Sequence, residues 1–164
     1  MRILVCTASR HGATREIGSR LRDVIAADLA GPAGSVVVDH RDAADRFDLS
    51  QYGAIVLGSA VYLGRWLKPA ERLADRLRLE HGGRPVWLFS SGPIIDGDDA
   101  ENLKWARTAW AVEHHMFGGK LDRAVLSWHE RLAVAAAKAT DGDRRSEADI
   151  DQWAATISAS LSNT

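Results

Sequence analysis

The sequence predicts a doubly wound α/β domain, in which a parallel sheet is covered on both faces by helices. Two observations carry this prediction. Short, almost continuously apolar runs are typical of strands that are buried on both sides. Between these runs lie longer segments whose apolar residues recur at helical spacing. The 164 residues suit one such domain, and no repeat or linker divides them. We therefore expect a single domain over residues 1–164.

Apolar runs define the strands of the predicted sheet. Four of them are predicted as strands, at residues 3–6, 36–38, 54–57 and 86–89. A fifth strand is needed before the last helix, and two segments compete for it. These are residues 115–118 and residues 124–127, of which we favour the first.

The predicted helices alternate with these strands. They cover residues 14–29, 67–79, 101–110 and 147–161. In the first, Ile17, Leu21 and Ile25 share one face, and Gly31 directly before a proline ends the helix. Ser146 stands in position to cap the last helix.

Composition excludes several classes of protein. The chain has 21 basic and 22 acidic residues, a net charge of −1, so the strong positive field typical of nucleic-acid binding is not expected. No run approaches the ~20 apolar residues that a membrane span needs. The N-terminus enters a strand pattern without the apolar region of a signal peptide. Cys6 is the only cysteine, which excludes an internal disulfide and a cysteine metal cluster. We expect a cytoplasmic protein without a metal site.

A turn between the first strand and the first helix is the leading candidate for ligand binding. In an open α/β sheet, ligands bind outside the carboxyl ends of the strands. Gly12 permits close approach of the backbone to an anion. Thr14 is placed to cap the helix, and Arg10 adds charge. Amides at a helix N-terminus attract phosphate. The candidate phosphate-binding residues are Ser9, Arg10, His11, Gly12, Ala13 and Thr14.

This turn has two interpretations other than the binding of a single phosphate group. A capped helix start is also ordinary protein architecture, and the turn alone does not decide between that interpretation and phosphate binding. The turn matches neither the triphosphate-binding loop nor the dinucleotide fingerprint. Because the turn lacks a lysine, triphosphate chemistry is not expected.

Two further loops follow the third and fourth predicted strands. Small residues there permit close approach to a flat ring, and aromatic side chains would form its walls. The candidates in the second loop are Ser59, Ala60, Val61, Tyr62, Gly64 and Trp66, and those in the third are Ser90, Ser91 and Gly92. The alternatives are that Trp66 packs at a helix start and that the third loop is only a connection. Together, the three loops describe a site for a mononucleotide such as flavin mononucleotide (FMN).

At these residues the chain resembles the flavodoxin-like superfamily. The segment Ser9-Arg10-His11-Gly12-Ala13-Thr14 is similar to the flavodoxin phosphate loop, (Ser/Thr)-x-Thr-Gly-x-Thr, with His11 in place of the middle threonine. Residues 8–14, 58–66 and 117–122 resemble the branch that contains menaquinone-dependent protoporphyrinogen dehydrogenases. The resemblance implies a three-layer sandwich with a five-stranded parallel sheet in the order 2-1-3-4-5. It also implies non-covalent FMN, with its phosphate on the first loop and its ring between the other two.

Three functions are compatible with this resemblance. The first is an FMN-dependent oxidoreductase that moves electrons between a reduced substrate, with protoporphyrinogen as a candidate, and a quinone or similar acceptor. The second is a one-electron carrier, which the weak net charge disfavours because dedicated carriers of this fold are strongly acidic. The third is a module that no longer binds FMN, supported only by His11. No catalytic residue is assigned. His114 and His115 are candidates for a proton relay, but we favour surface or strand-end histidines.

The resemblance also bears on partners. Quinone-linked members of the branch touch the membrane through an insertion before the last helix, which corresponds here to residues 122–143. Residues 124–139 are predicted as a helix, but its apolar positions are mostly alanine, which disfavours strong insertion. We favour packing on the domain or on a second copy of the chain. Weak contact with the inner face of the membrane is the alternative.

Overall fold

The computed structural model describes residues 1–31, 36–62, 64–92, 110–118, 120–121, 142–143 and 146–163. Strands and helices alternate along most of this length. The elements are β1 (Arg2–Ala8), α1 (Ala13–Asp28), β2 (Val37–Asp42), the 3₁₀ turn η1 (Leu49–Gln51), β3 (Ala54–Tyr62), β4 (Arg65–Trp66), α2 (Lys68–Glu80), β5 (Val86–Gly92), β6 (Glu113–Gly118), β7 (Lys120–Leu121), β8 (Gly142–Asp143) and α4 (Glu147–Ser162).

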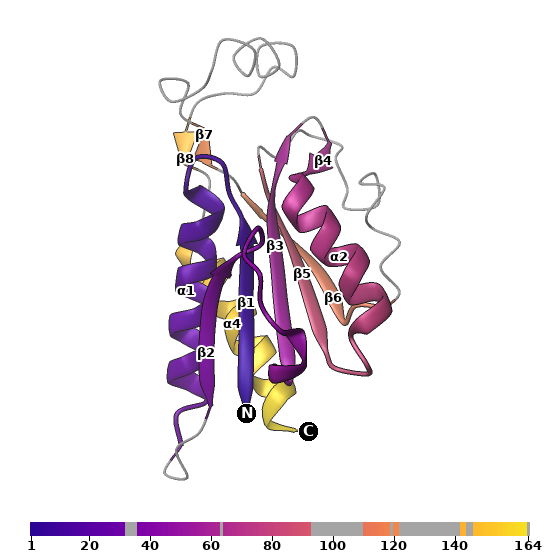
Figure 1. Cartoon of the computed structure of the whole chain (residues 1–164). Helices are drawn as coiled ribbons and strands as arrows, with labels where there is room; N and C mark the ends of the chain where they lie inside the picture. Colours follow the sequence, from indigo (N-terminus) through magenta and orange to yellow (C-terminus); the bar gives the residue numbers. More distant parts are fainter. Residues whose placement is uncertain are drawn as a thin grey trace.

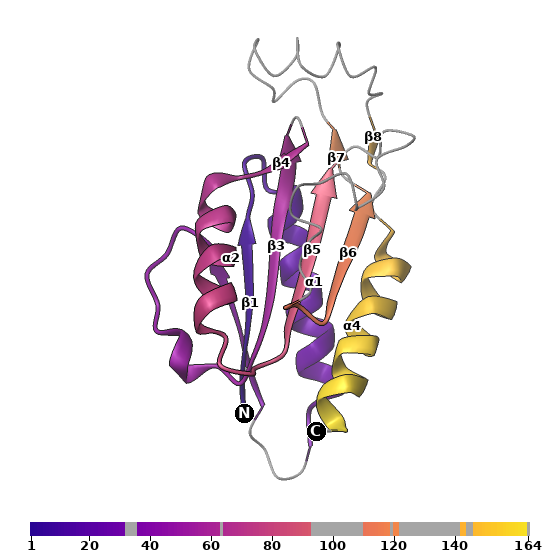
Figure 2. The ribbon, with the colours of Figure 1, turned by 90° about the vertical axis from the view of Figure 1, so that its right-hand side faces the viewer.

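The five long strands form one parallel sheet in the order β2-β1-β3-β5-β6. When these five are counted alone, this is the predicted order 2-1-3-4-5. The two-residue β4 pairs antiparallel with β3 and is an addition to that pattern. Helices α1 and α4 cover one face of the sheet, and α2 covers the other (Figures 1 and 2). The predicted three-layer arrangement is thus confirmed.

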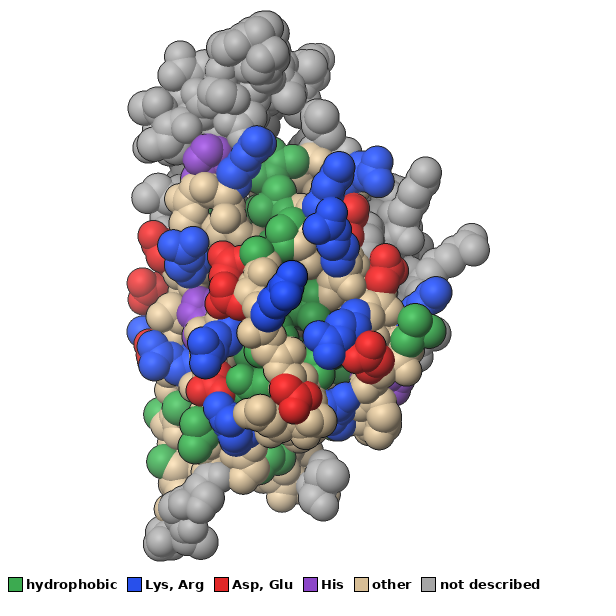
Figure 3. Space-filling model, viewed as in Figure 1, with side chains coloured by type: hydrophobic (Ala, Val, Ile, Leu, Met, Phe, Trp, Pro, Cys, Tyr) green, Lys and Arg blue, Asp and Glu red, His purple; other side chains and the backbone are tan. Residues whose placement is uncertain are grey.

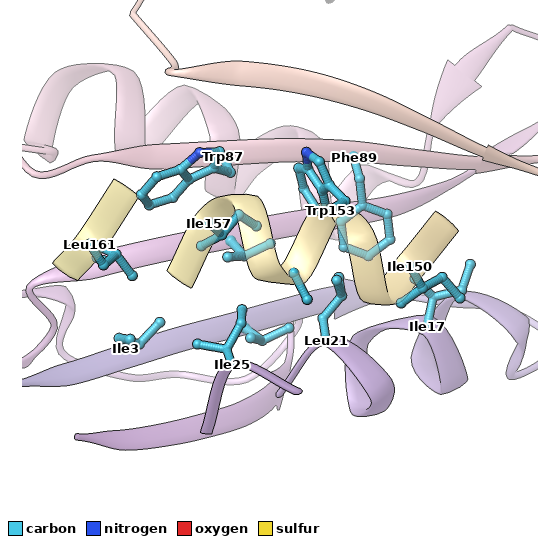
Figure 4. Packing of buried hydrophobic residues seen from close by; sticks show 14 of the residues in the cluster. Ile3, Ile17, Leu21, Ile25, Trp87, Phe89, Ile150, Trp153, Ile157 and Leu161 are labelled. Carbon is cyan, nitrogen blue, oxygen red and sulfur yellow. The ribbon is translucent and has the colours of Figure 1, made fainter. Parts of the chain in front are cut away.

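Alternation along the strands divides the core between the two faces. On β1, Ile3 and Val5 face α1 and α4, whereas Leu4 and Cys6 face α2. Figure 4 shows the first of these cores, where the α4 residue Trp153 lies next to the β5 residue Phe89. Because successive strand residues point to opposite faces, a strand covered on both sides must be apolar throughout. The continuous apolar runs in the sequence follow from this geometry.

The predicted elements agree closely with the described ones. All four predicted strands are present and extend further than their apolar runs, and the favoured fifth strand corresponds to β6. Helices α1, α2 and α4 begin or end within one residue of the predicted bounds. The Ser146 side chain caps α4 by accepting a hydrogen bond from the amide of Asp149 (3.3 Å). The competing strand at 124–127, the helix at 124–139 and nearly all of the helix at 101–110 lie outside the described residues.

None of the described helices is long and apolar enough to cross a membrane. Nor do the described histidine, cysteine and acidic side chains form a group of three or more that would hold a metal ion.

Candidate functional site

The loop between β1 and α1 has the geometry of an anion-binding turn. Gly12 is the N-cap of α1 and has φ = +91°, a left-handed conformation that favours glycine. The first helical hydrogen bond runs from the amide of Glu16 to the carbonyl of Gly12 (2.9 Å). The amides of residues 13–15 precede it and have no acceptor within the helix. They lie at the positive end of the helix dipole, at the carboxyl edge of the sheet.

The Thr14 and Ser9 side chains of this loop do not have the roles that the sequence predicted. Thr14 does not cap the helix, because Gly12 occupies the N-cap and no side chain caps it. Thr14 instead lies in the first turn of α1 and is buried. The Ser9 hydroxyl oxygen accepts a hydrogen bond from the Gly12 amide (3.0 Å) and so shapes the loop itself. The sequence pattern pointed to Thr14 rather than Gly12 as the cap, because glycine at an N-cap is less common than a hydroxyl residue.

Tyr62 connects the first loop to the second. The guanidinium carbon of Arg10 lies 5.8 Å from the centre of the Tyr62 ring. The His11 imidazole meets the same ring edge-on, with the two centres 6.4 Å apart. Two basic side chains of the first loop therefore lie against the aromatic residue at the end of β3, and the predicted phosphate and ring regions adjoin.

The second loop is a tight hairpin between β3 and β4. Val61 pairs with Trp66 and Tyr62 with Arg65, while Gly64 has φ = +70° at the turn. Ala60, Val61 and Tyr62 are half-buried. A Cβ on Gly92, the last residue of β5, would lie 3.2 Å from the Val61 Cβ, so the hairpin also adjoins the start of the third loop. Residues 93–109, which follow Gly92 in the sequence, are outside the described part of the chain.

Four residues that were predicted to contact the flavin ring are buried in the interior of the protein. Trp66 is 3% exposed, and its indole Nε1 donates to the Ser90 hydroxyl (2.7 Å), so the packing alternative for Trp66 is the one the structure supports. The Ser59 hydroxyl accepts from the amide of Leu67 (3.0 Å) and donates to the carbonyl of Ala60 (2.9 Å). Ser59 and Ser90 are fully buried, and Ser91 is 3% exposed. These serines lie within β3 and β5 rather than in loops after them. Ser59 and Ser90 bond to the hairpin rather than line an open surface.

His114 and His115 are the second and third residues of β6, close to its start as the strand-end interpretation expected, but both are half-buried rather than on the surface. Both lie within β6, and they point to opposite faces of the sheet. His115 stacks on Trp153 of α4 (ring centres 5.1 Å apart), with its Nε2 3.3 Å from an oxygen of Asp149. His114 lies on the α2 side, where its ring meets Trp66 edge-on. Adjacent strand residues necessarily face opposite ways, and this was the signal that could have separated them.

His114 belongs to a polar network that the sequence did not reveal. Its Nε2 is 2.9 Å from the Ser90 hydroxyl oxygen. Burial lowers the pKa of His114 to about 4, with a smaller contribution from the nearby charge of His115. The ring is therefore neutral near pH 7. Among the described residues, its buried Nδ1 has no hydrogen-bond partner.

These features define a flavodoxin-like α/β protein in which the glycine-capped start of α1 lies beside an aromatic hairpin. The sequence matches the family model described as "Flavodoxin domain" over residues 4–147, and the chain belongs to that family. No curated protein matches the sequence.

Solved structures support the same fold. A single-residue variant of flavodoxin from Pseudomonas aeruginosa is 17% identical, with a TM-score of 0.60 and 99% of each chain covered. A flavodoxin from the domain Archaea is 20% identical, with a TM-score of 0.53, 84% of this chain and 97% of that chain covered. Rubredoxin:oxygen oxidoreductase from Desulfovibrio gigas is 13% identical, with a TM-score of 0.66. That match covers 99% of this chain but 36% of the oxidoreductase.

Proposed function

We propose that this protein binds FMN non-covalently and is an oxidoreductase that moves electrons between a reduced substrate and a quinone or similar acceptor. The observation that carries the proposal is the position of the loop from Ser9 to Thr14. This loop presents the unbonded amides of a helix start directly beside the Tyr62 hairpin. Membership of the flavodoxin domain family supports the same cofactor.

The donors in the first loop fit a phosphate ester. The amides of residues 13–15 would hold its oxygens, and the hydroxyl of Thr14 would add a donor. Ser9 would not bind the phosphate itself but would hold the loop in shape, because its hydroxyl oxygen accepts a hydrogen bond from the Gly12 amide. Arg10 and His11 supply basic groups near the dianion. With hydroxyl, amide and basic donors in one loop, the residues present suit the group that the family implies.

The hairpin fits a flat, largely apolar ring. Tyr62 would form one wall, and Ala60, Val61 and Gly64 would allow the backbone to approach the ring edge. Gly92 borders the same region. Bound FMN would supply the electron transfer itself. The protein would bind it, orient the ring toward the carboxyl edge of the sheet and exclude water from its inner side. We assign no acid or base, since His114 and His115 are committed to contacts within the fold.

Charge favours the oxidoreductase over a dedicated one-electron carrier. The net charge is −1, and on the face shown in Figure 3 basic and acidic side chains are interspersed. Such a surface would steer a redox partner only weakly. Residues 8–14, 58–66 and 117–122 resemble the branch that contains protoporphyrinogen dehydrogenases. On that basis protoporphyrinogen is our candidate reductant and a quinone our candidate acceptor. The flavodoxin-like carrier is the second candidate, because the structural similarity includes flavodoxins over their full length.

The purified protein tests this proposal directly. It should be yellow with flavin absorbance, or become so when FMN is added, and it should oxidise protoporphyrinogen in the presence of a quinone analogue. Stepwise one-electron reduction of bound FMN without turnover of either substrate would identify a carrier. Colourless protein that FMN cannot restore would overturn both readings and leave an interaction module.

A further inference from the structure

Trp66, Ser90 and His114 form a buried polar chain that joins β4, β5 and β6. An indole N–H only donates, so the Ser90 oxygen accepts from Trp66 Nε1 (2.7 Å). The Ser90 hydroxyl and His114 Nε2, 2.9 Å apart, form the second bond. Ser90 is fully buried, and Trp66 is 3% exposed. Loss of the Ser90 oxygen would therefore remove this hydrogen-bond acceptor of the indole N–H in the interior.

A second serine holds the adjacent residue of the hairpin. Ser59 and Ser90 are paired residues of β3 and β5. Ser59 accepts the amide of Leu67, and Ser90 accepts the indole of Trp66. Two consecutive residues on the return of the hairpin are thus attached to two neighbouring strands of the sheet. The hairpin has little freedom to shift while both bonds are present.

The attached segment sets the position of the residues proposed to meet the flavin ring. Trp66 pairs with Val61, and the next pair outward joins Tyr62 to Arg65. Val61 in turn lies close to the Cα of Gly92, at the end of the strand that carries Ser90. We propose that Ser90 is a positioning residue: through Trp66 it fixes the hairpin against the end of β5, and so sets the width of the ring site. This inference rests on the proposed function for the identity of the ring, and on the hydrogen bonds alone for the position of the hairpin.

Ligands that carry different parts of FMN separate this role from general destabilisation. Riboflavin contains the ring without the phosphate, and inorganic phosphate occupies the first loop alone. The Ser90→Ala variant should bind riboflavin and FMN about tenfold more weakly, each by the same factor, because one buried donor loses its acceptor. Its affinity for inorganic phosphate should not change, since the amides of residues 13–15 do not depend on Ser90.

Hydrogen exchange tests the position of the hairpin without any flavin. The amides of Trp66 and Leu67 should exchange faster in Ser90→Ala than in the unaltered chain, while amides within α1 keep their protection. Trp66→Phe removes the indole donor but keeps an aromatic ring, and should have the same effects. Both changes break the Trp66–Ser90 bond, and Ser90→Ala also breaks the Ser90–His114 bond. The double variant should therefore bind riboflavin no more weakly than Ser90→Ala alone.

Ser158→Ala is the matched control. Ser158 is also buried (4% exposed), but its hydroxyl donates to the carbonyl of Ala154 within α4, on the other face of the sheet. This variant should leave unchanged both the affinity for riboflavin and the hydrogen-exchange rates of the Trp66 and Leu67 amides. Equal effects in Ser158→Ala, a parallel loss of phosphate affinity in Ser90→Ala, or additive losses in the double variant would each overturn the positioning role.

The two proposals fail in distinguishable ways. If the unaltered chain binds neither FMN nor riboflavin, the proposed function is wrong, and hairpin exchange alone decides whether Ser90 positions the hairpin. If the Trp66 and Leu67 amides exchange hydrogen at the same rate in Ser90→Ala as in the unaltered chain, the positioning role is wrong whatever the flavin affinity.

Discussion

Gly58 and Phe89 are paired residues of β3 and β5, and the Phe89 ring fills the space that a side chain at position 58 would need. A Cβ on Gly58 would lie 2.0 Å from Phe89 Cζ, far inside van der Waals contact. Phe89 is fully buried and meets both Phe117 and Trp153 edge-on. This glycine within β3 is thus required by the core beneath the site.

Gly58→Ala should therefore destabilise the fold by about 3 kcal/mol, the upper part of the range for overpacking a core. Urea unfolding would measure the loss as a lower midpoint. Gly53→Ala is the control. Its Cβ would come closest to the flexible side chain of Met1 (3.2 Å) and would meet the Arg2 carbonyl oxygen at ordinary van der Waals distance (3.8 Å), so the change should stay within about 0.5 kcal/mol. Phe89→Leu introduced into Gly58→Ala should recover part of the loss. An unaltered midpoint in Gly58→Ala would contradict the packing described above.

Gly12→Ala should cost about 1–2 kcal/mol of stability, because an L-residue is strained at φ = +91°. Among the described residues other than its two chain neighbours, none has an atom within 4 Å of the site of its Cβ, so the cost would come from the backbone alone. Thermal or urea unfolding of this variant measures it.

Gly31→Ala provides the comparison for Gly12→Ala. The space around Gly31 is equally open, but its backbone is not in the left-handed region, so this change should be nearly neutral. Equal stability of the two variants would argue against the left-handed turn before α1.

Thr14→Ala should weaken FMN binding by about 1–3 kcal/mol, the cost of leaving a charged acceptor short of one donor. Thr14→Ser keeps the hydroxyl and should retain most of the affinity. Riboflavin lacks the phosphate, so its binding should not change in either variant. Titration of flavin fluorescence gives both affinities, and an FMN affinity that Thr14→Ala leaves intact would remove this hydroxyl from the phosphate site.

His114 should make the protein less stable as the pH falls from about 6.5 to about 4. The folded state keeps the ring neutral down to a pKa of about 4, whereas the unfolded chain takes up a proton near pH ~6.5. Between these values the unfolded state binds more protons, so the free energy of unfolding decreases on acidification. The total change should be on the order of 3 kcal/mol, and below pH ~4 this residue adds no further loss.

His114→Gln tests this assignment, because an amide can still bond to the Ser90 hydroxyl but does not titrate. Unfolding free energies measured at several pH values should show a shallower acid loss in this variant than in the unaltered chain. Parallel curves for the two proteins would show that His114 is not the group responsible.

Local sequence patterns were sufficient to predict most of the fold. The strands β1, β3 and β5 are buried on both faces, so burial itself left continuous apolar runs that periodicity detects. The amphipathic spacing of α1 and α4 gave their bounds to within one residue. The two-residue β4 was not predicted, because it is too short for a pattern and exists only through its pairing with β3.

The location of the candidate site could be predicted from the sequence, but the side-chain contacts within it could not. The loops after β1, β3 and β5 were located because topology alone brings the carboxyl ends of parallel strands to one edge. Nothing local distinguishes Ser59 and Ser90, which bond inward, from a serine that faces a ligand. The same holds for Tyr62, whose contacts with Arg10 and His11 join residues more than fifty positions apart.

The sequence by itself determined the order of strands and helices, the parallel sheet and the family, because each is recorded in the spacing of apolar residues or in short motifs. Only the tertiary structure decided that Ser90 forms hydrogen bonds with Trp66 and His114, and that His114 and His115 face opposite sides of the sheet. The physical reason is that periodicity states which face of an element is buried. The partner a buried polar group finds there depends on which strands the fold places side by side.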